Sequence, residues 1–204
     1  MLSAPIPANE AARLKALREL LVLDTPPEAR YDRIVAFAAA EFDVPMALIS
    51  LVDEDRQWFK ASVGLDVCET SRDVSFCGHA ILTPNTMVVP DALDDIRFMD
   101  NPLVLGDPHI RFYAGAPIVT GDGLALGTVC VIDRETRTLS DAQRASLQSL
   151  ARLVMTLMEH EAQNRQQAAE QVEGLVKILG LVADDEHAEA GAIAGLEAWA
   201  AEED

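Results

Sequence analysis

The sequence predicts an α+β domain in which an antiparallel sheet is flanked by helices at both ends of the chain. Apolar residues follow helical spacing over residues 10–21 and again after residue 140. Between these stretches lie strand-length apolar runs that come in pairs separated by turn residues. Strands joined by hairpins, without the strand–helix alternation of parallel sheets, indicate the α+β class.

Two helices are expected at the N-terminal end. Residues 1–9 contain two prolines and are expected to be flexible. A first helix should open at residue 9 or 10, because the leucines over residues 14–21 share one helical face. Thr25 and Glu28 have the spacing of a capping box, with prolines between them, so a second helix is expected to begin with Thr25 as its cap.

The first hairpin is expected over residues 45–63. Residues 45–52 are a dense apolar run of strand length, and an acidic turn follows at residues 53–55. Residues 57–63 alternate as the returning strand, which places Trp58 and Phe59 on opposite faces, both in core packing. Strict alternation would put Lys60 and Ser62 with Trp58, and Ala61 and Val63 with Phe59.

A second hairpin is expected over residues 112–133, with its turn at residues 120–123, which read Thr-Gly-Asp-Gly. Residues 65–110 are rich in proline, aspartate and asparagine and contain one short strand at residues 87–89. We expect loops and short helices there, covering one face of the sheet. Loops of this length in a compact domain usually have a function.

The last helix is expected to be long. Ser140 and Gln143 form a second capping box, and the apolar residues of 147–157 follow coiled-coil spacing. The positions that continue this spacing are polar at first and become apolar again at Leu175, Ile178, Leu179 and Val182. These last residues could contact a dimer partner or a signalling protein. We therefore expect a core domain over residues 10–165, a helical extension over 166–183 and an acidic tail over 184–204.

Composition excludes several classes of function. The formal net charge of -18 disfavours binding to nucleic acid and to anionic membranes. Three cysteines are too few and odd in number for a secreted disulfide framework. The chain shows no signal peptide and no run of about 18 apolar residues, so we expect a cytoplasmic protein.

Five segments of the chain resemble GAF domains, particularly the bacterial branch found beside histidine kinases and diguanylate cyclases. The resemblance covers about residues 10–165. It implies a three-layer domain: a central antiparallel sheet of about six strands, the N- and C-terminal helices on one face, and loops enclosing a small-molecule pocket on the other. The matching segments are residues 23–28 (LDTPPE), 50–53 (SLVD) with 56–59 (RQWF), 75–81 (SFCGHAI), 111–117 (RFYAGAP) and 126–133 (LGTVCVID).

The resemblance implies a non-catalytic sensory or regulatory module, as in two-component systems. It would bind an unknown small molecule, form a homodimer through its N- and C-terminal helices, and signal through the last helix to a partner in trans. No cofactor or metal is established by the pattern. The candidate pocket residues are Phe59, Phe76, Cys77, His79, Asp91, Phe98, Arg111 and Tyr113.

Two alternatives stay open. The chain could be a dimerisation scaffold whose pocket has no ligand. It could also resemble the GAF domains that reduce free methionine sulfoxide, because Cys68 and Cys77 flank the same loop as that family's cysteine pair. The third cysteine of that family belongs before Arg111, where this chain has none, and Cys130 is expected to pack in the core. Covalent attachment of a bilin is not expected either, since residues 106–110 lack cysteine.

Cys77 and His79 have two possible roles. Both are zinc-ligand types, but no CxxC or HxxxH pattern supplies the remaining ligands of a closed site. We therefore favour a short helix in which Cys77 packs as a small apolar residue and His79 is hydrogen-bonded. Lining the ligand pocket is the alternative.

Arg111 could grip a carboxylate or phosphate of a ligand in a bidentate fork. The preceding loops also place four acidic residues within possible reach. We favour a salt bridge within the protein, to one of Asp91, Asp94, Asp95 and Asp107.

Overall fold

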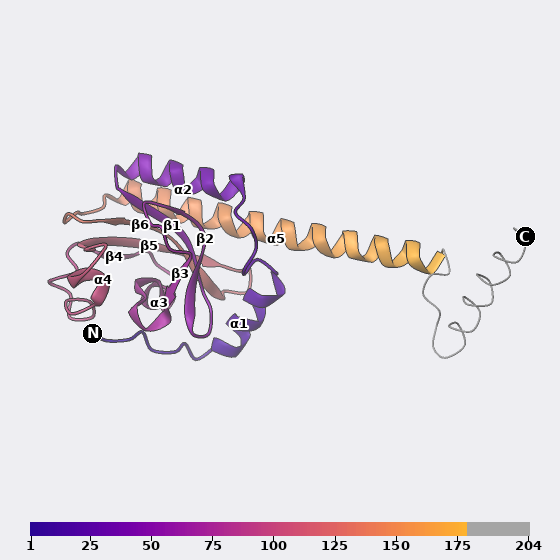
Figure 1. Ribbon diagram of the computed structural model, residues 1–204, viewed down its shortest axis with the longest axis horizontal. Coiled ribbons are helices and arrows are strands. Elements are labelled where there is room, and N and C mark those ends of the chain that lie inside the picture. The colour runs from indigo at the N-terminus through magenta and orange to yellow at the C-terminus, as the bar shows by residue number, and fades with distance from the viewer. Residues whose placement is uncertain (179–204) are drawn as a thin grey trace, which may run out of the picture. The chain divides into compact units, whose positions relative to one another are not determined.

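A six-stranded antiparallel sheet forms the centre of the computed structural model, which describes residues 1–178 (Figure 1). The chain divides into two units, residues 1–162 and 163–204, and the sheet belongs to the first. The strand order is β3-β2-β1-β6-β5-β4, which confirms the predicted α+β class. The strands are β1 (Met46–Val52), β2 (Arg56–Val63), β3 (Glu69–Ser71), β4 (Met87–Val89), β5 (Phe112–Val119) and β6 (Ala125–Asp133).

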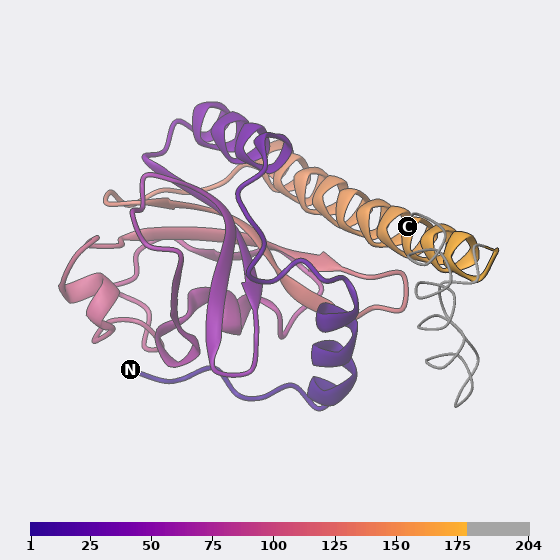
Figure 2. The same ribbon diagram turned by 45° about the vertical axis from the view of Figure 1, so that its right-hand side comes forward.

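One face of the sheet is covered by long helices. α2 (Ala29–Phe42) and the beginning of α5 (Asp141–Ile178) lie side by side over it (Figure 2). α1 (Glu10–Glu19) adds Leu17 to the same core, and Leu147 and Val154 of α5 are fully buried there. This helix-side core is mostly aliphatic, and it includes Trp58 from β2.

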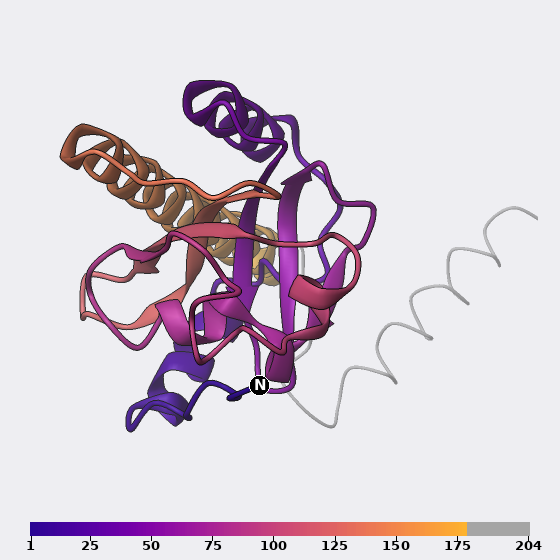
Figure 3. The ribbon, with the colours of Figure 1, turned by 90° about the vertical axis from the view of Figure 1, so that its left-hand side faces the viewer.

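The opposite face is covered by short elements and loops, as predicted. These elements are the 3₁₀ helix η1 (Arg72–Val74), α3 (Phe76–Ala80) and α4 (Pro102–Leu105). The N-terminal segment runs along the outside of this layer (Figure 3), where the Leu2 amide donates to the Arg97 carbonyl over 3.2 Å. A second core lies between these elements and the sheet, and Phe59, Phe76, Phe98 and Tyr113 belong to it.

The two expected capping boxes had different outcomes. Ser140 and Gln143 cap α5: the Gln143 amide donates to Ser140 Oγ over 3.3 Å, and the Ser140 amide donates to Gln143 Oε1 over 3.0 Å. The expected cap at Thr25 is wrong. α2 begins at Ala29 without a side-chain cap, because Thr25 Oγ1 instead donates to the Val22 carbonyl and accepts from Lys60.

The second half of β2 also differs from the expected alternation. A bulge opposite Ile49 and Ser50 inserts Lys60 as an extra residue, since Ile49 pairs with Ala61 while Ser50 pairs with Phe59. Trp58 and Phe59 do lie on opposite faces, but Ala61 returns to the helix side with Trp58. Periodicity alone gives no sign of such an insertion.

The remaining expectations on organisation stay predictions. None of the helices over residues 1–178 has the length and apolar character needed to cross a membrane. Leu179, Val182 and the expected acidic tail over residues 184–204 lie outside the described residues. The boundaries at residues 9, 165 and 183 are not tested by the fold.

Candidate functional site

A cavity of about 410 Å³ lies between the sheet and the loop layer. Strands β1, β2, β5 and β6 supply its floor, α3 and α4 one wall, and the loops around residues 64–67 and 107–110 the other parts. Its volume is within the ~300–1,000 Å³ typical of small-molecule sites. The lining residues are Leu48, Gln57, Phe59, Gly64, Leu65, Asp66, Val67, Thr70, Phe76, Cys77, Leu103, Asp107, Pro108, Ile110, Tyr113, Ile132 and Arg134.

Four of the eight predicted site residues line this cavity: Phe59, Phe76, Cys77 and Tyr113. Phe98 does not line it but supports the wall from behind, because its ring stacks on Phe76 with centroids 3.9 Å apart. The Phe76 ring also lies 5.2 Å from the Tyr113 ring. The aromatic wall is therefore held by ring–ring contacts within the loop-side core.

His79 belongs to the supporting structure. It lies on α3 and its Nε2 is 2.9 Å from the Leu2 carbonyl oxygen, which ties the N-terminal segment to the loop layer. Burial lowers the pKa of His79, so the neutral ring is favoured. The structure confirms the short helix with a buried Cys77 and a hydrogen-bonded His79. The alternative also holds for Cys77, which lines the cavity, but not for His79.

Asp91 and Arg111 pair with each other outside the cavity. Arg111 donates from Nε to Asp91 Oδ1 over 2.8 Å and from Nη2 to Oδ2 over 2.5 Å. These hydrogen bonds lower the pKa of Asp91. The favoured salt bridge of Arg111 is confirmed, with Asp91 as the partner, so a residue of the protein itself occupies the bidentate fork.

Two groups of polar residues at the cavity were missed by sequence reasoning. On the floor, Gln57 Nε2 donates to Thr70 Oγ1 over 2.6 Å, and Ser75 Oγ donates to Gln57 Oε1. At the rim, Asp66, Asp107 and Arg134 are exposed, and Arg134 Nε donates to the Pro108 carbonyl over 2.9 Å. The sequence signal that could have found them is position near strand ends, because Arg134 directly follows β6 and Asp66 lies three residues after the end of β2.

The two buried cysteines lie side by side. The Sγ atoms of Cys77 and Cys130 are 3.9 Å apart, and the Tyr113 hydroxyl donates to Cys77 Sγ over 3.4 Å. Cys130 is buried in the core as expected, whereas Cys68 is exposed. Within residues 1–178 no cluster of three or more histidine, cysteine, aspartate or glutamate residues could hold a metal ion.

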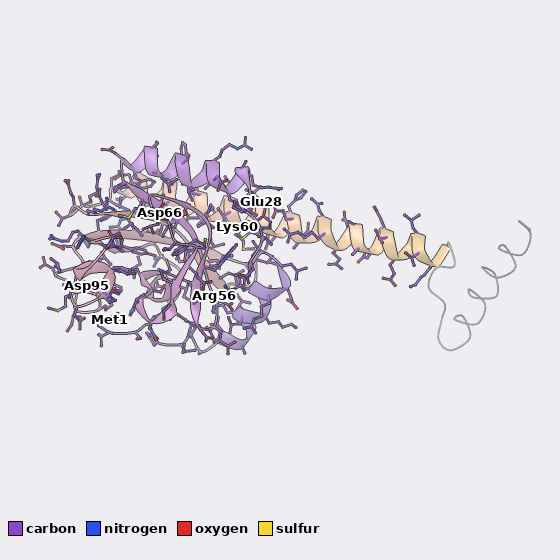
Figure 4. All side chains as sticks on the ribbon, in the orientation of Figure 1. Met1, Glu28, Arg56, Lys60, Asp66 and Asp95 are labelled. Atoms are coloured by element: carbon purple, nitrogen blue, oxygen red, sulfur yellow. The ribbon has the colours of Figure 1, made fainter. Side chains whose placement is uncertain are left out.

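A polar network connects β2 with α2 at the bulge (Figure 4). The ammonium group of Lys60, whose side chain is fully buried, donates to Glu28 Oε1 over 2.5 Å, to Thr25 Oγ1 over 2.7 Å and to the Pro26 carbonyl over 3.1 Å. It also lies 5.1 Å from the centroid of the Tyr31 ring. Burial would raise the pKa of Glu28, but the hydrogen bond from Lys60 contributes to a net lowering.

The same network reaches α5. The Tyr31 hydroxyl donates to Glu161 Oε2 over 3.0 Å, and Arg30 forms an ion pair with Glu161 Oε1 at 2.6 Å. Burial and the neighbouring Glu161 raise the pKa of Tyr31, so its hydroxyl stays a donor. Phe59 in the cavity floor is thus one residue from Lys60, and contacts continue from Lys60 through Tyr31 to α5.

Comparisons with known proteins agree on one family. The model of the GAF domain matches residues 26–158. A cyclic di-GMP phosphodiesterase of Pseudomonas aeruginosa is 47% identical over 156 residues, which are 76% of this chain and 27% of that protein. The chain therefore spans about a quarter of the curated relative it matches.

Two solved structures show the same fold. The GAF domain of an Acinetobacter phosphoenolpyruvate-protein phosphotransferase has a TM-score of 0.54 at 20% identity, covering 73% of this chain and 94% of that one. The free methionine-R-sulfoxide reductase of Neisseria meningitidis, solved with its substrate, has a TM-score of 0.56 at 19% identity, covering 80% and 98%. At these identities the likeness concerns the fold alone.

Proposed function

The chain belongs to the GAF domain family, and on that premise we propose that it is a regulatory module that binds a small molecule in the cavity and relays its occupancy through α5. The single observation that carries the proposal is the path along β2. Phe59 faces the cavity, and the adjacent Lys60 is held in the network that reaches Glu161 of α5.

The proposed relay works by a shift between two arrangements of this network. A ligand that contacts Phe59 favours one position of the β2 bulge, and the position of Lys60 sets the position of Glu28 and Tyr31. Coupling arises because the ligand has different affinities for the two arrangements. Signal transduction then uses the described contacts of α2 and α5, without any chemical step.

The lining supports a ligand with an apolar body and a charged or polar head group. The walls are aromatic and aliphatic, whereas the rim carries Arg134, Asp66 and Asp107. Because a relative is named a cyclic di-GMP phosphodiesterase, we further propose that the output controlled by this module belongs to cyclic-dinucleotide signalling, carried by another domain or by a partner. We also propose that the protein is located in the cytoplasm.

The proposed module works as a homodimer through its helices. Phe37 of α2 and Leu153 of α5 are 53% and 46% exposed on the helix layer, although both are large and apolar. A second copy would cover such residues and bring two relay helices together. The scaffold alternative shares the dimer but requires no ligand.

Native mass spectrometry of the purified protein, compared with its denatured mass, tests the proposal. A dimer with an additional mass that is lost on denaturation supports a ligand-binding module. Leu103→Trp should remove that mass because Leu103 lines the cavity, whereas Leu105→Trp on the same helix should retain it because Leu105 is 62% exposed. A dimer without ligand, even from cell extract exchanged only into volatile buffer, would favour the scaffold.

The reductase alternative predicts a different result. Turnover of free methionine sulfoxide with a thioredoxin system and NADPH would contradict the non-catalytic role. In that case Cys77→Ser should abolish NADPH oxidation, and so should Cys68→Ser, because both cysteines belong to the pair on which the resemblance depends.

A further inference from the structure

The paired thiols of Cys77 and Cys130 have no part in the proposed relay. Cys77 lies on α3 and Cys130 on β6, and 53 positions separate them in the sequence. Their Sγ atoms nevertheless lie 3.9 Å apart, with the side chains 2% and 0% exposed. A disulfide has its sulfurs about 2 Å apart, so an approach of about 2 Å would bring the two sulfurs to bonding distance.

The hydroxyl of Tyr113 is positioned to stabilise a thiolate on Cys77. It donates to Cys77 Sγ over 3.4 Å, and Tyr113 itself is fully buried. Gly115 makes this position possible, because a Cβ atom there would lie 2.1 Å from the Tyr113 hydroxyl oxygen. Hydrogen bonds from the Cys130 thiol and the Tyr113 hydroxyl lower the pKa of Cys77, while the neighbouring Cys77 and burial raise the pKa of Cys130.

The cavity gives the two cysteines different roles. Cys77 is among the cavity-lining residues and Cys130 is not, so a small reagent inside the cavity meets Cys77 first. Cys130 is shielded from the cavity but remains in contact with Cys77. A more acidic, accessible thiol beside a protonated, shielded one is the arrangement of an attacking and a resolving cysteine.

We propose that Cys77 and Cys130 are a redox modification site at which a small hydroperoxide is reduced and an intramolecular disulfide forms. The Cys77 thiolate attacks one peroxide oxygen, the O–O bond breaks, and the leaving alkoxide or hydroxide takes a proton to become an alcohol or water. Cys77 is then a sulfenic acid. Cys130 attacks its sulfur, the S–S bond forms, and hydroxide leaves as water with the Cys130 proton. Two thiols and one hydroperoxide thus give a disulfide, an alcohol or water, and a further water.

The modification would fix α3 to β6 and alter the wall of the cavity. This inference shares the cavity with the proposed function but does not depend on it, because the hydroperoxide needs only to enter and leave. Failure of the proposed function can therefore be distinguished from failure of the redox inference. Ligand retention is measured on the reduced protein, and disulfide formation is measured on protein without ligand.

The test is oxidation of the reduced full chain with one equivalent of hydrogen peroxide or of tert-butyl hydroperoxide. Free thiols are then blocked, and the protein is digested without reductant. The expected product is a peptide pair linked through Cys77 and Cys130 that disappears after treatment with dithiothreitol. Cys68→Ser is the matched control, since Cys68 is exposed and outside the pair, and it should give the same linked peptides.

Two further variants assign the roles. Cys130→Ala should leave a sulfenic acid on Cys77 that dimedone traps. Tyr113→Phe keeps the ring but removes the donated hydrogen bond, so disulfide formation should slow by about tenfold. Thermal melting of each reduced variant confirms that it is folded.

The wild-type mapping decides the matter even if a variant does not fold. Oxidation confined to Cys68, or a linkage that joins Cys68 to either buried cysteine, would overturn the proposal. Recovery of Cys77 and Cys130 as free thiols after both hydroperoxides would overturn it as well.

Discussion

The two faces of the sheet are built from the same strands, but one face packs in a closed core and the other borders a cavity. On the helix side, long helices close an aliphatic core that contains Ile49, Ala114 and Val131. On the loop side, their strand neighbours Leu48, Tyr113 and Cys130 face aromatic rings, a second thiol and a cavity. Because side chains alternate along a strand, each strand contributes to the closed core on one face and to the cavity and the thiol pair on the other.

The difference shows where stability and adaptability reside. Helices satisfy their own backbone hydrogen bonds and can bury a continuous apolar stripe, which leaves few voids. Loops and short helices pack less completely, so a cavity can exist without exposing the core of the domain. The bulge at Lys60 is the place where the two faces meet, because it follows Phe59 in the floor of the cavity and contacts the helix layer.

The largest effect is expected from breaking this junction. Lys60→Met removes a buried ammonium with three hydrogen-bond acceptors and leaves Glu28 without its nearest cation. Glu28 keeps its ion pair with Arg30 at 3.1 Å, so the loss comes from the three acceptors that lose a charged donor. We expect the free energy of unfolding to fall by about 4 kcal/mol. Urea denaturation measures this loss, and ligand-dependent change in α5 should disappear in the same variant.

Lys15→Met is the control for the Lys60 variant. Lys15 pairs with Glu19 at 3.7 Å on α1, with side chains 76% and 65% exposed. An exposed pair of this kind contributes little to stability, so the unfolding midpoint should hardly change. Equal losses in the two lysine variants would show that the buried junction has no special role.

A smaller effect is expected from cavities introduced into the two faces. Leu147→Ala in the helix-side core should lower the free energy of unfolding by about 3 kcal/mol, because close-packed neighbours lose their contacts. Ile110→Ala should lower it by about 1.5 kcal/mol, because Ile110 already borders the cavity and has fewer contacts to lose. Equal losses would contradict a difference in packing between the faces.

Sequence reasoning succeeded where local patterns decide the structure. Ser140 and Gln143 cap α5 because both partners lie within one turn and bond to each other. Thr25 and Glu28 have the same spacing, but Lys60, more than 30 residues away, takes both side chains. A buried cation is a tertiary feature, and it overrides the local preference.

The same distinction applies to the candidate site. Phe59, Phe76, Cys77 and Tyr113 were identified through the family resemblance, because each lies in a segment that matches GAF domains. The proximity of Cys130 to Cys77 was missed, since it depends on how α3 packs against β6. Arg134 was missed because its place at the rim depends on the path of residues 107–110.

Acid should weaken the contact that joins α1 to the loop layer. Burial would raise the pKa of Glu10, but hydrogen bonds from Arg13 and Arg72 lower it from 4.5 to about 2. Because the folded pKa is the lower one, the ionised form stabilises the fold above the unfolded pKa, and this contribution is lost as the pH falls from about 5 to about 2. With allowance for solvent screening we expect a loss of about 2 kcal/mol.

Denaturation of Glu10→Gln at several pH values measures this contribution. The variant should be less stable than the wild type at pH 7, and the difference should vanish near pH 2. Glu19→Gln is the matched control on the same helix, because Glu19 is 65% exposed and its pair with Lys15 is long. A difference for Glu10→Gln that is constant with pH would contradict the assignment.

The smallest change in stability is expected at the two arginines of the loop side, Arg111 and Arg134. Ligand retention in their variants distinguishes a structural arginine from one that contacts the ligand. Arg111 is held by Asp91 away from the cavity, so Arg111→Gln should leave ligand retention in native mass spectrometry unchanged. Arg134→Gln should leave the unfolding midpoint unchanged but reduce ligand retention, because Arg134 lies at the rim. The opposite pattern, with ligand lost only in Arg111→Gln, would mean that Arg111 leaves Asp91 to hold the ligand and that the cavity opens much further than its present walls allow.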